Sequence, residues 1–284
     1  MLKTKSTMKQ KTQQSIMTKT KVMTVVWLEA ILRNFPNAVE GQKLTVDISD
    51  YLQRIHGLTR ENTLFGFSTC ADEINRTVTQ FRTHYGEKQF PLGGLTGYPF
   101  RGKTGFVAFL HHTPNHGAEG NVIILYGPHV GVTYEGELGK VLREGQSHES
   151  AACGAALSFL NKYLEAKKSK QTYQPKKDHL DMEQYAFERM ILPYADDILR
   201  ADKPVKKLVE INYELIDGAV RDIIKERKNN FNGKIALVGG IMINTPHLQP
   251  SYFDLRRFQI YLNGKVTDLL LELENATRHQ TNKK

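Results

Sequence analysis

The sequence predicts an α/β fold with a mostly parallel central sheet flanked by helices. Segments with helical periodicity alternate with short apolar segments along the 284-residue chain. Two of these apolar segments, 121–126 and 234–243, are almost continuously apolar rather than alternating. Such runs are typical of strands that are buried on both faces of a parallel sheet. Glycine or proline lies beside several of them, as expected where buried strands end.

The predicted helices have an apolar face or recognisable ends. Val25, Leu28 and Ile31 share one helical face, and Pro36 follows the end of that helix. Ser147 or Ser150 is a candidate cap for a later helix. Helices are predicted over residues 23–34, 44–57, 69–85, 147–168, 180–200, 204–229 and 267–276.

The predicted strands are short apolar segments between turn residues. Strands are predicted over residues 62–68, 106–110, 121–126, 234–243 and 256–262. Asn263-Gly264 predicts a turn that leads into the last helix. The glycine-rich segment 90–105 is expected to be irregular.

Composition and charge bound the class of protein. Hydrophobic residues make up 40% and charged residues 24% of the chain. These values are typical of a soluble globular protein and exclude a mostly disordered chain, a collagen-like chain and a disulfide scaffold. Residues 1–21 contain six lysines and no acidic residue, so they account for most of the net charge of +9. We expect 1–21 to be a disordered basic tail and 22–284 to form a single α/β domain.

The chain offers no sign of a membrane or nucleic-acid partner. No run of about 18 apolar residues occurs, so no membrane span is predicted. The lysine runs lack interleaved aromatic residues, and no nucleic-acid-binding module is recognisable. No secretory signal is visible, so we expect a cytoplasmic protein, although the lysine-rich start leaves an organellar address open. In a reducing compartment Cys70 and Cys153 are expected to be free thiols or metal ligands.

One segment matches the P-loop pattern of nucleotide-binding proteins. Gly97-Tyr98-Pro99-Phe100-Arg101-Gly102-Lys103-Thr104 fits it letter for letter. A P-loop must follow a buried strand, and a helix must begin at its lysine so that the helix dipole faces phosphate. Because 106–110 is predicted to be a strand, we interpret the segment as a tight glycine loop that lines another pocket. Nucleotide binding through Lys103 stays an alternative.

Potential metal ligands follow the predicted buried strands. Cys70 comes after the strand 62–68, and His129 follows the strand 121–126. Cys153 lies in the first turns of a predicted helix, whose dipole favours a thiolate. Two thiolates and one imidazole suit zinc, and three protein ligands leave a fourth position open. The cysteines could equally be small buried residues and His129 a hydrogen-bonded core residue.

Asp72 and Arg76 accompany these candidate ligands. They are four residues apart in the predicted helix 69–85, so we expect their side chains to meet on one face.

Three ordered motifs resemble one known family. They are Phe67-Ser68-Thr69-Cys70-Ala71-Asp72-Glu73-Ile74-Asn75-Arg76, the stretch from Gly93-Gly94-Leu95 to His111-His112, and Tyr126-Gly127-Pro128-His129-Val130-Gly131-Val132. Together they resemble the limiting-CO2-inducible B/C family of theta-type carbonic anhydrases, which are similar in structure to the beta class. The resemblance covers roughly residues 40–275. The gaps from Asp72 to Arg76 and from His129 to Cys153 are longer than those in the usual beta-class pattern.

The resemblance implies a zinc enzyme that reversibly hydrates CO2 to bicarbonate by zinc-bound hydroxide. It implies that Cys70, His129 and Cys153 bind Zn2+, and that Asp72 and Arg76 are the catalytic carboxylate and guanidinium. The domain 22–284 would then be the zinc-binding catalytic domain, and the family forms homodimers. Some family members lack activity, so a non-catalytic zinc protein of the same fold, which binds a partner or bicarbonate, is the alternative function.

Overall fold

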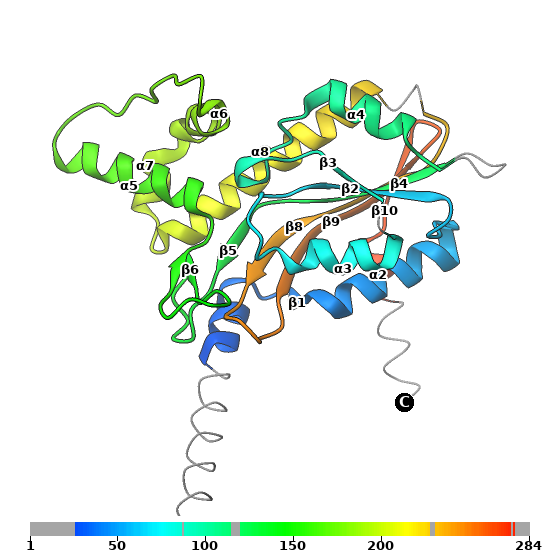
Figure 1. Cartoon of the computed structure of the whole chain (residues 1–284), viewed down its shortest axis with the longest axis horizontal. Coiled ribbons are helices and arrows are strands. Elements are labelled where there is room, and N and C mark those ends of the chain that lie inside the picture. Colours follow the sequence, from blue (N-terminus) through cyan, green and yellow to red (C-terminus); the bar gives the residue numbers. More distant parts are fainter. Residues whose placement is uncertain (1–25, 87, 115–119, 228–230, 274, 276–284) are drawn as a thin grey trace, which may run out of the picture.

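A computed structural model describes residues 26–86, 88–114, 120–227, 231–273 and 275 of the chain. The expected basic tail, residues 1–21, lies outside these described residues. A central sheet runs through the molecule and is covered by helices on both faces (Figure 1). Among the described residues, no helix is both long enough and apolar enough to cross a membrane.

The described part of the central sheet has eight strands. In spatial order, six of them are β1 (Ala38–Glu40), β9 (Tyr252–Leu262), β8 (Ile235–Asn244), β4 (Asn121–Tyr126), β2 (Thr63–Ser68) and β3 (Gln89–Pro91). Strands β8, β4, β2 and β3 are parallel, whereas β9 pairs antiparallel with β8 and β1 antiparallel with β9. The other two strands are β5 (His129–Gly131), which is parallel to β8, and β10 (Lys265–Asp268), which is antiparallel to β9. The predicted α/β fold with a mostly parallel sheet is confirmed.

Alternate residues of the central strand β4 point into two separate cores, because side chains alternate across a strand. Val122, Ile124 and Tyr126 pack in the core that contains apolar residues of α4 (Gly102–His111) and α8 (Pro204–Arg227). Ile123 and Leu125 pack in the core under α2 (Gly41–His56) and α3 (Arg76–Tyr85). Figure 1 shows these two helix pairs on opposite faces of the sheet. Burial on both faces explains why β4 and β8 are continuously apolar.

Three further helices form an arm that projects from one end of the sheet (Figure 1). They are α5 (Gly154–Lys168), α6 (Met182–Ile191) and α7 (Ala195–Arg200), and the short 3-10 turn η2 (Leu192–Tyr194) joins the last two. Their apolar side chains form a third core, which also contains Cys70 and Cys153. A small antiparallel pair of strands, β6 (Lys140–Val141) and β7 (Ser150–Ala151), precedes the arm.

Several predicted elements differ in the structure. The segment 106–110, predicted as a strand, belongs to the helix α4, and its buried residues Phe106, Phe109 and Leu110 follow helical spacing. A short continuous apolar run fits either a strand or a buried helix, which is why the prediction was wrong. After the Asn263-Gly264 turn the chain forms β10, and of the predicted last helix, 267–276, the described residues 270–273 and 275 are helical. Helices α3 and α5 begin later than predicted, at Arg76 and Gly154.

Candidate metal centre

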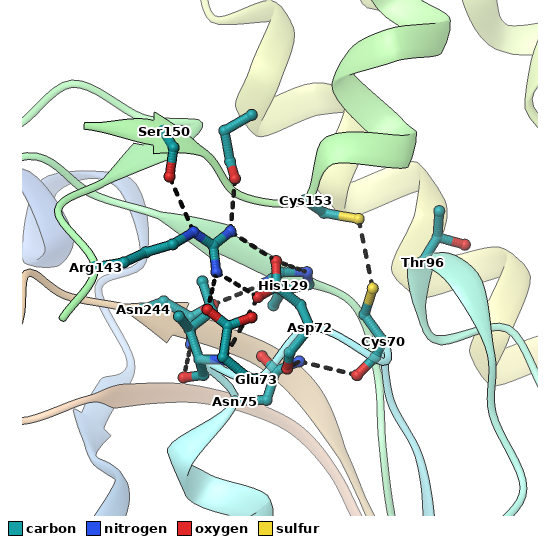
Figure 2. Close-up of polar contacts among 12 residues, drawn as sticks. Cys70, Asp72, Glu73, Asn75, Thr96, His129, Arg143, Ser150, Cys153 and Asn244 are labelled. Carbon is teal, nitrogen blue, oxygen red and sulfur yellow. Dashed lines mark hydrogen bonds and ion pairs between the residues drawn. The ribbon is translucent and has the colours of Figure 1, made fainter. Parts of the chain in front are cut away.

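The structure brings Cys70, His129 and Cys153 together (Figure 2). Their potential ligand atoms all lie within 4.8 Å of one another, and the two sulfur atoms are 3.8 Å apart. All three residues are buried. Cys70 follows the carboxyl end of β2, His129 opens β5, and Cys153 is the N-cap residue of α5. This cluster could therefore hold a metal ion.

Glycines at the strand ends allow the close approach that places His129. Strands β4 and β5 both pair with β8 and are separated by Gly127-Pro128. Gly127 has a φ of 142°, and a Cβ atom there would lie 1.8 Å from the carbonyl oxygen of Gly240. Only glycine fits this position, since both the backbone conformation and the contact exclude a side chain. The chain can thus step past Gly240 and return to the sheet at His129, opposite Met242.

A hydrogen bond from the neighbouring strand fixes the tautomer of His129. Its Nδ1 lies 2.7 Å from Oδ1 of Asn244, the last residue of β8. The amide nitrogen of Asn244 donates to the carbonyl oxygen of Ile74 at 2.7 Å, so the amide oxygen must face His129. Nδ1 is therefore the protonated nitrogen. Nε2 is buried without a hydrogen-bond partner among the described residues, as expected for a nitrogen that binds a metal.

The two thiols differ in acidity because they share a hydrogen bond. The hydrogen bond from Cys153 lowers the pKa of Cys70 well below its usual range, and His129 lowers it further. The same hydrogen bond, together with burial, raises the pKa of Cys153. Burial would lower the pKa of His129, but Cys70 and Asp72 outweigh this effect and raise it. Negative charge thus gathers at the cluster, which favours a cation there.

Asp72 lies beside the cluster and is paired with Arg143 rather than with Arg76 (Figure 2). The Arg143 guanidinium donates to both carboxylate oxygens of Asp72, at 2.6 and 3.0 Å. Burial alone would raise the pKa of Asp72, but the hydrogen bonds from Arg143 and the charge of His129 lower it to about 2. Asp72 Oδ2 lies 3.8 Å from Nε2 of His129, so an ionised carboxylate faces the possible metal position.

Arg143 is itself held from several sides. Its guanidinium also donates to Glu73 at 2.6 Å, to the hydroxyl of Ser150 at 2.9 Å and to the carbonyl oxygen of Ala151 at 2.8 Å. These partners include both residues of β7, which ends two residues before Cys153. Such a planar, fully engaged guanidinium keeps one orientation.

The expected contact between Asp72 and Arg76 is not formed. Helix α3 begins at Arg76, so Asp72 lies before it and the four-residue spacing does not place both side chains on one helical face. Arg76 instead donates to the carbonyl oxygens of Thr245 and Gln249 and to the Thr245 hydroxyl. It therefore holds the loop that follows Asn244.

Two important residues of this cluster were missed in the sequence. Arg143 is 71 residues from Asp72, and no local spacing connects them. Asn244 could have been found, because it is a polar residue at the carboxyl end of a predicted buried strand, where α/β proteins place their sites.

The P-loop-like segment lies beside the backbone of the candidate ligands, and nucleotide binding through Lys103 stays an untested alternative. Residues 106–110 belong to the helix α4, which begins at Gly102. The argument against a P-loop that rested on a strand at 106–110 was therefore wrong. However, Lys103 lies at the surface, where its Nζ is 2.6 Å from Glu226. A Cβ atom on Gly97 would lie 2.5 Å from the Gly127 carbonyl oxygen and 3.4 Å from the Cys70 nitrogen. The glycine loop thus packs against the backbone that carries two of the candidate ligands.

Comparisons with known proteins identify the family of this chain. The family described as limiting CO2-inducible proteins B/C beta carbonic anhydrases matches residues 38–262. The crystal structure of PtLCIB4, a homolog of the limiting CO2-inducible protein LCIB, is 35% identical with a TM-score of 0.76 and covers 85% of this chain and 98% of its own. The structure of LCIB is 20% identical with a TM-score of 0.63, covers 84% of this chain and 96% of its own, and shows the same fold. A comparison with curated proteins gave no match. The chain therefore belongs to the family of limiting CO2-inducible B/C beta-carbonic anhydrases.

Proposed function

We propose that the protein is a zinc-dependent carbonic anhydrase that interconverts CO2 and bicarbonate. The observation that carries the proposal is the buried Cys70–His129–Cys153 cluster beside an ionised Asp72. Two sulfur donors and one imidazole nitrogen without a hydrogen-bond partner fit zinc and would leave one coordination position open. When bound in such a site, zinc lowers the pKa of a water molecule to about 7 and so supplies a nucleophile at neutral pH.

The remaining residues would hold and orient the groups around that water. Asp72 stays ionised because of Arg143, so its Oδ2 can accept a hydrogen bond and orient the nucleophile. Asn244 holds the His129 ring with Nε2 directed at the cluster. We therefore propose Asp72 and Arg143 as the catalytic carboxylate and its guanidinium partner. Arg76 acts at a greater distance by holding the loop after Asn244.

Stopped-flow CO2 hydration on the zinc-loaded full chain tests the proposal. We expect about one zinc per chain and a rate well above that of the Cys70→Ser variant. Cys70→Ser and Cys153→Ser should each lose zinc, because each removes one of three protein ligands. Zinc that is retained by both variants would contradict the ligand assignment.

The same experiment distinguishes the alternative function. A protein that binds zinc through this cluster, but hydrates CO2 no faster than Cys70→Ser at any pH, would be a non-catalytic zinc protein of the same fold. Such a protein would bind a partner or bicarbonate instead.

We also propose that the protein is a homodimer, on the basis of the family resemblance. Size-exclusion chromatography with light scattering should give twice the chain mass of 32.3 kDa. A mass of one chain at micromolar concentration would contradict this. A cytoplasmic location remains a prediction, and it is compatible with the two unpaired cysteines.

A further inference from the structure

A cavity lies next to the candidate ligands, between β5, α5 and α8. His129 and Cys153 form part of its lining. Most of the other lining side chains are apolar, and they include Val130, Ala156, Leu157, Leu208 and Val209. One polar side chain, that of Asn212 on α8, also lines it. An apolar cavity with one polar group beside a possible metal position has the composition of a small-ligand site.

The amide of Asn212 is buried and only partly used. The residue is 2% exposed, and its Nδ2 donates one hydrogen bond, at 3.1 Å, to the carbonyl oxygen of Thr96. Its Oδ1 is buried and has no hydrogen-bond partner among the described residues. An amide nitrogen carries two hydrogens, so one donor remains in addition to the free acceptor. A buried acceptor without a partner is costly, so it calls for an explanation.

The orientation of this amide is determined by the loop that it contacts. The Thr96 carbonyl can only accept a hydrogen bond, so the nitrogen of Asn212 must face it and the oxygen must point elsewhere. Thr96 is fully buried in the short 3-10 turn η1 (Leu95–Gly97), and Figure 2 shows it near Cys70 and Cys153. Glu183 accepts a hydrogen bond from the Leu95 nitrogen at 2.8 Å, which anchors this turn to α6. The free amide oxygen is therefore held in one place.

We propose that Asn212 positions the substrate in this cavity. Its amide oxygen accepts the O–H of bicarbonate, and its remaining amide hydrogen donates to an oxygen of bicarbonate or CO2. The apolar walls suit CO2, which has no hydrogen to donate, while a neutral amide does not repel the bicarbonate anion as a carboxylate would. This inference rests on the proposed function, because it assigns a role within the same site.

Asn212→Leu in the zinc-loaded full chain tests the proposal, since leucine keeps a similar volume without polar atoms. We expect the KM for CO2 to rise about tenfold, as for the loss of one or two hydrogen bonds, with a smaller change in kcat. Zinc content should stay at the wild-type level. The second readout does not need turnover: sodium bicarbonate is titrated into the cobalt-substituted protein, and its Kd, read from the visible spectrum, should also rise about tenfold.

Ser68→Ala is the matched control. The Ser68 hydroxyl donates to the Gly97 carbonyl oxygen at 3.0 Å, so this variant also loosens the turn at Thr96, but Ser68 does not line the cavity. We expect KM and the bicarbonate Kd of Ser68→Ala to match the wild type. An equal loss in both variants would show that Asn212 acts only by holding the turn, and would overturn the proposal.

The outcomes separate this proposal from the proposed function. Unchanged KM and bicarbonate Kd in Asn212→Leu, with zinc retained, would overturn the role of Asn212 and leave the carbonic anhydrase proposal standing. If the wild type binds bicarbonate but hydrates no CO2, the proposed function fails and the titration still tests Asn212. If the wild type binds no bicarbonate, the role of Asn212 fails. If Asn212→Leu does not fold, Asn212→Ser replaces it, with the same expected increase in Kd.

Discussion

Arg143 is predicted to keep Asp72 ionised, and Arg143→Met tests this directly. The substitution removes the two hydrogen bonds, of 2.6 and 3.0 Å, that hold both carboxylate oxygens. Methionine keeps much of the apolar stem of arginine, so the packing around it should change little. The side chain of Asp72 is 12% exposed in the wild type, and the variant removes its main cationic partner.

The size of the effect follows from the pKa of Asp72, which is about 2 against an ordinary value of 3.8. Without Arg143, burial still raises the pKa of Asp72 while His129 and Glu73 still lower it, so we expect this pKa to rise towards its ordinary value. A rise of about two units corresponds to about 2.5 kcal/mol, and solvent screening of the partly exposed carboxylate reduces this to about 1 kcal/mol. Because the pKa in the folded protein is below that in the unfolded chain, Asp72 stabilises the fold above about pH 4 and loses this effect towards pH 2.

The assay is urea unfolding of wild type and variant at pH 6 and pH 3, with EDTA so that acid release of metal does not contribute. We expect Arg143→Met to be destabilised at pH 6. At pH 3, where roughly half of the Asp72 effect is lost, its deficit in unfolding free energy should be smaller by about 0.5 kcal/mol. Arg76→Met is the matched control, because among the described residues Arg76 donates hydrogen bonds to carbonyl and hydroxyl oxygens, which do not titrate in this range. The reasoning would be refuted if Arg143→Met lost the same unfolding free energy at both pH values. It would also be refuted if the loss in Arg76→Met became smaller at pH 3.

Three further predictions follow from buried contacts. Asn244→Leu should lower zinc affinity about 10- to 100-fold, because the imidazole of His129 loses its orienting partner. Competition with a chromogenic chelator measures the zinc affinity, and an affinity equal to that of the wild type would refute the prediction. Asp217→Leu should lower the unfolding free energy by about 3 kcal/mol in urea melts, since Arg257 loses a partly buried bidentate partner. A change below about 0.5 kcal/mol would contradict this and show that water solvates the Arg257 guanidinium equally well. Gly66→Ala should lower the unfolding free energy by about 1–3 kcal/mol, because its Cβ would lie 2.6 Å from the Phe109 ring. A melting temperature equal to that of the wild type would contradict this prediction.

Local sequence was sufficient where the structure depends on neighbouring residues. The apolar segments 121–126 and 234–243 are strands because their own side chains exclude water on both faces of the sheet, and their boundaries were predicted to within a residue or so. The positions of Cys70 and His129 after two buried strands followed from the same reasoning, because the carboxyl ends of parallel strands meet at one edge. The motifs around them identify the family, and the family match confirms that identification.

Other features depend on the folded chain. The apolar segment 106–110 has no alternation that separates a strand from a helix, and its packing in one core with the sheet and α8 decides that it is helical. The predicted partner of Asp72, Arg76, was wrong. The four-residue spacing favoured Arg76, whereas the fold places Arg143, which is 71 residues away in the sequence, against Asp72.

The fold class, the family and the three candidate metal ligands follow from the sequence alone, because these depend on short motifs and on local burial. Which groups orient those ligands, and which groups line the neighbouring cavity, depends on the tertiary structure. Asn244 reaches His129 across 115 residues, and Asn212 reaches Thr96 across 116. A hydrogen bond acts only over about 3 Å, so its partners depend on how distant segments pack, and sequence spacing does not contain that information.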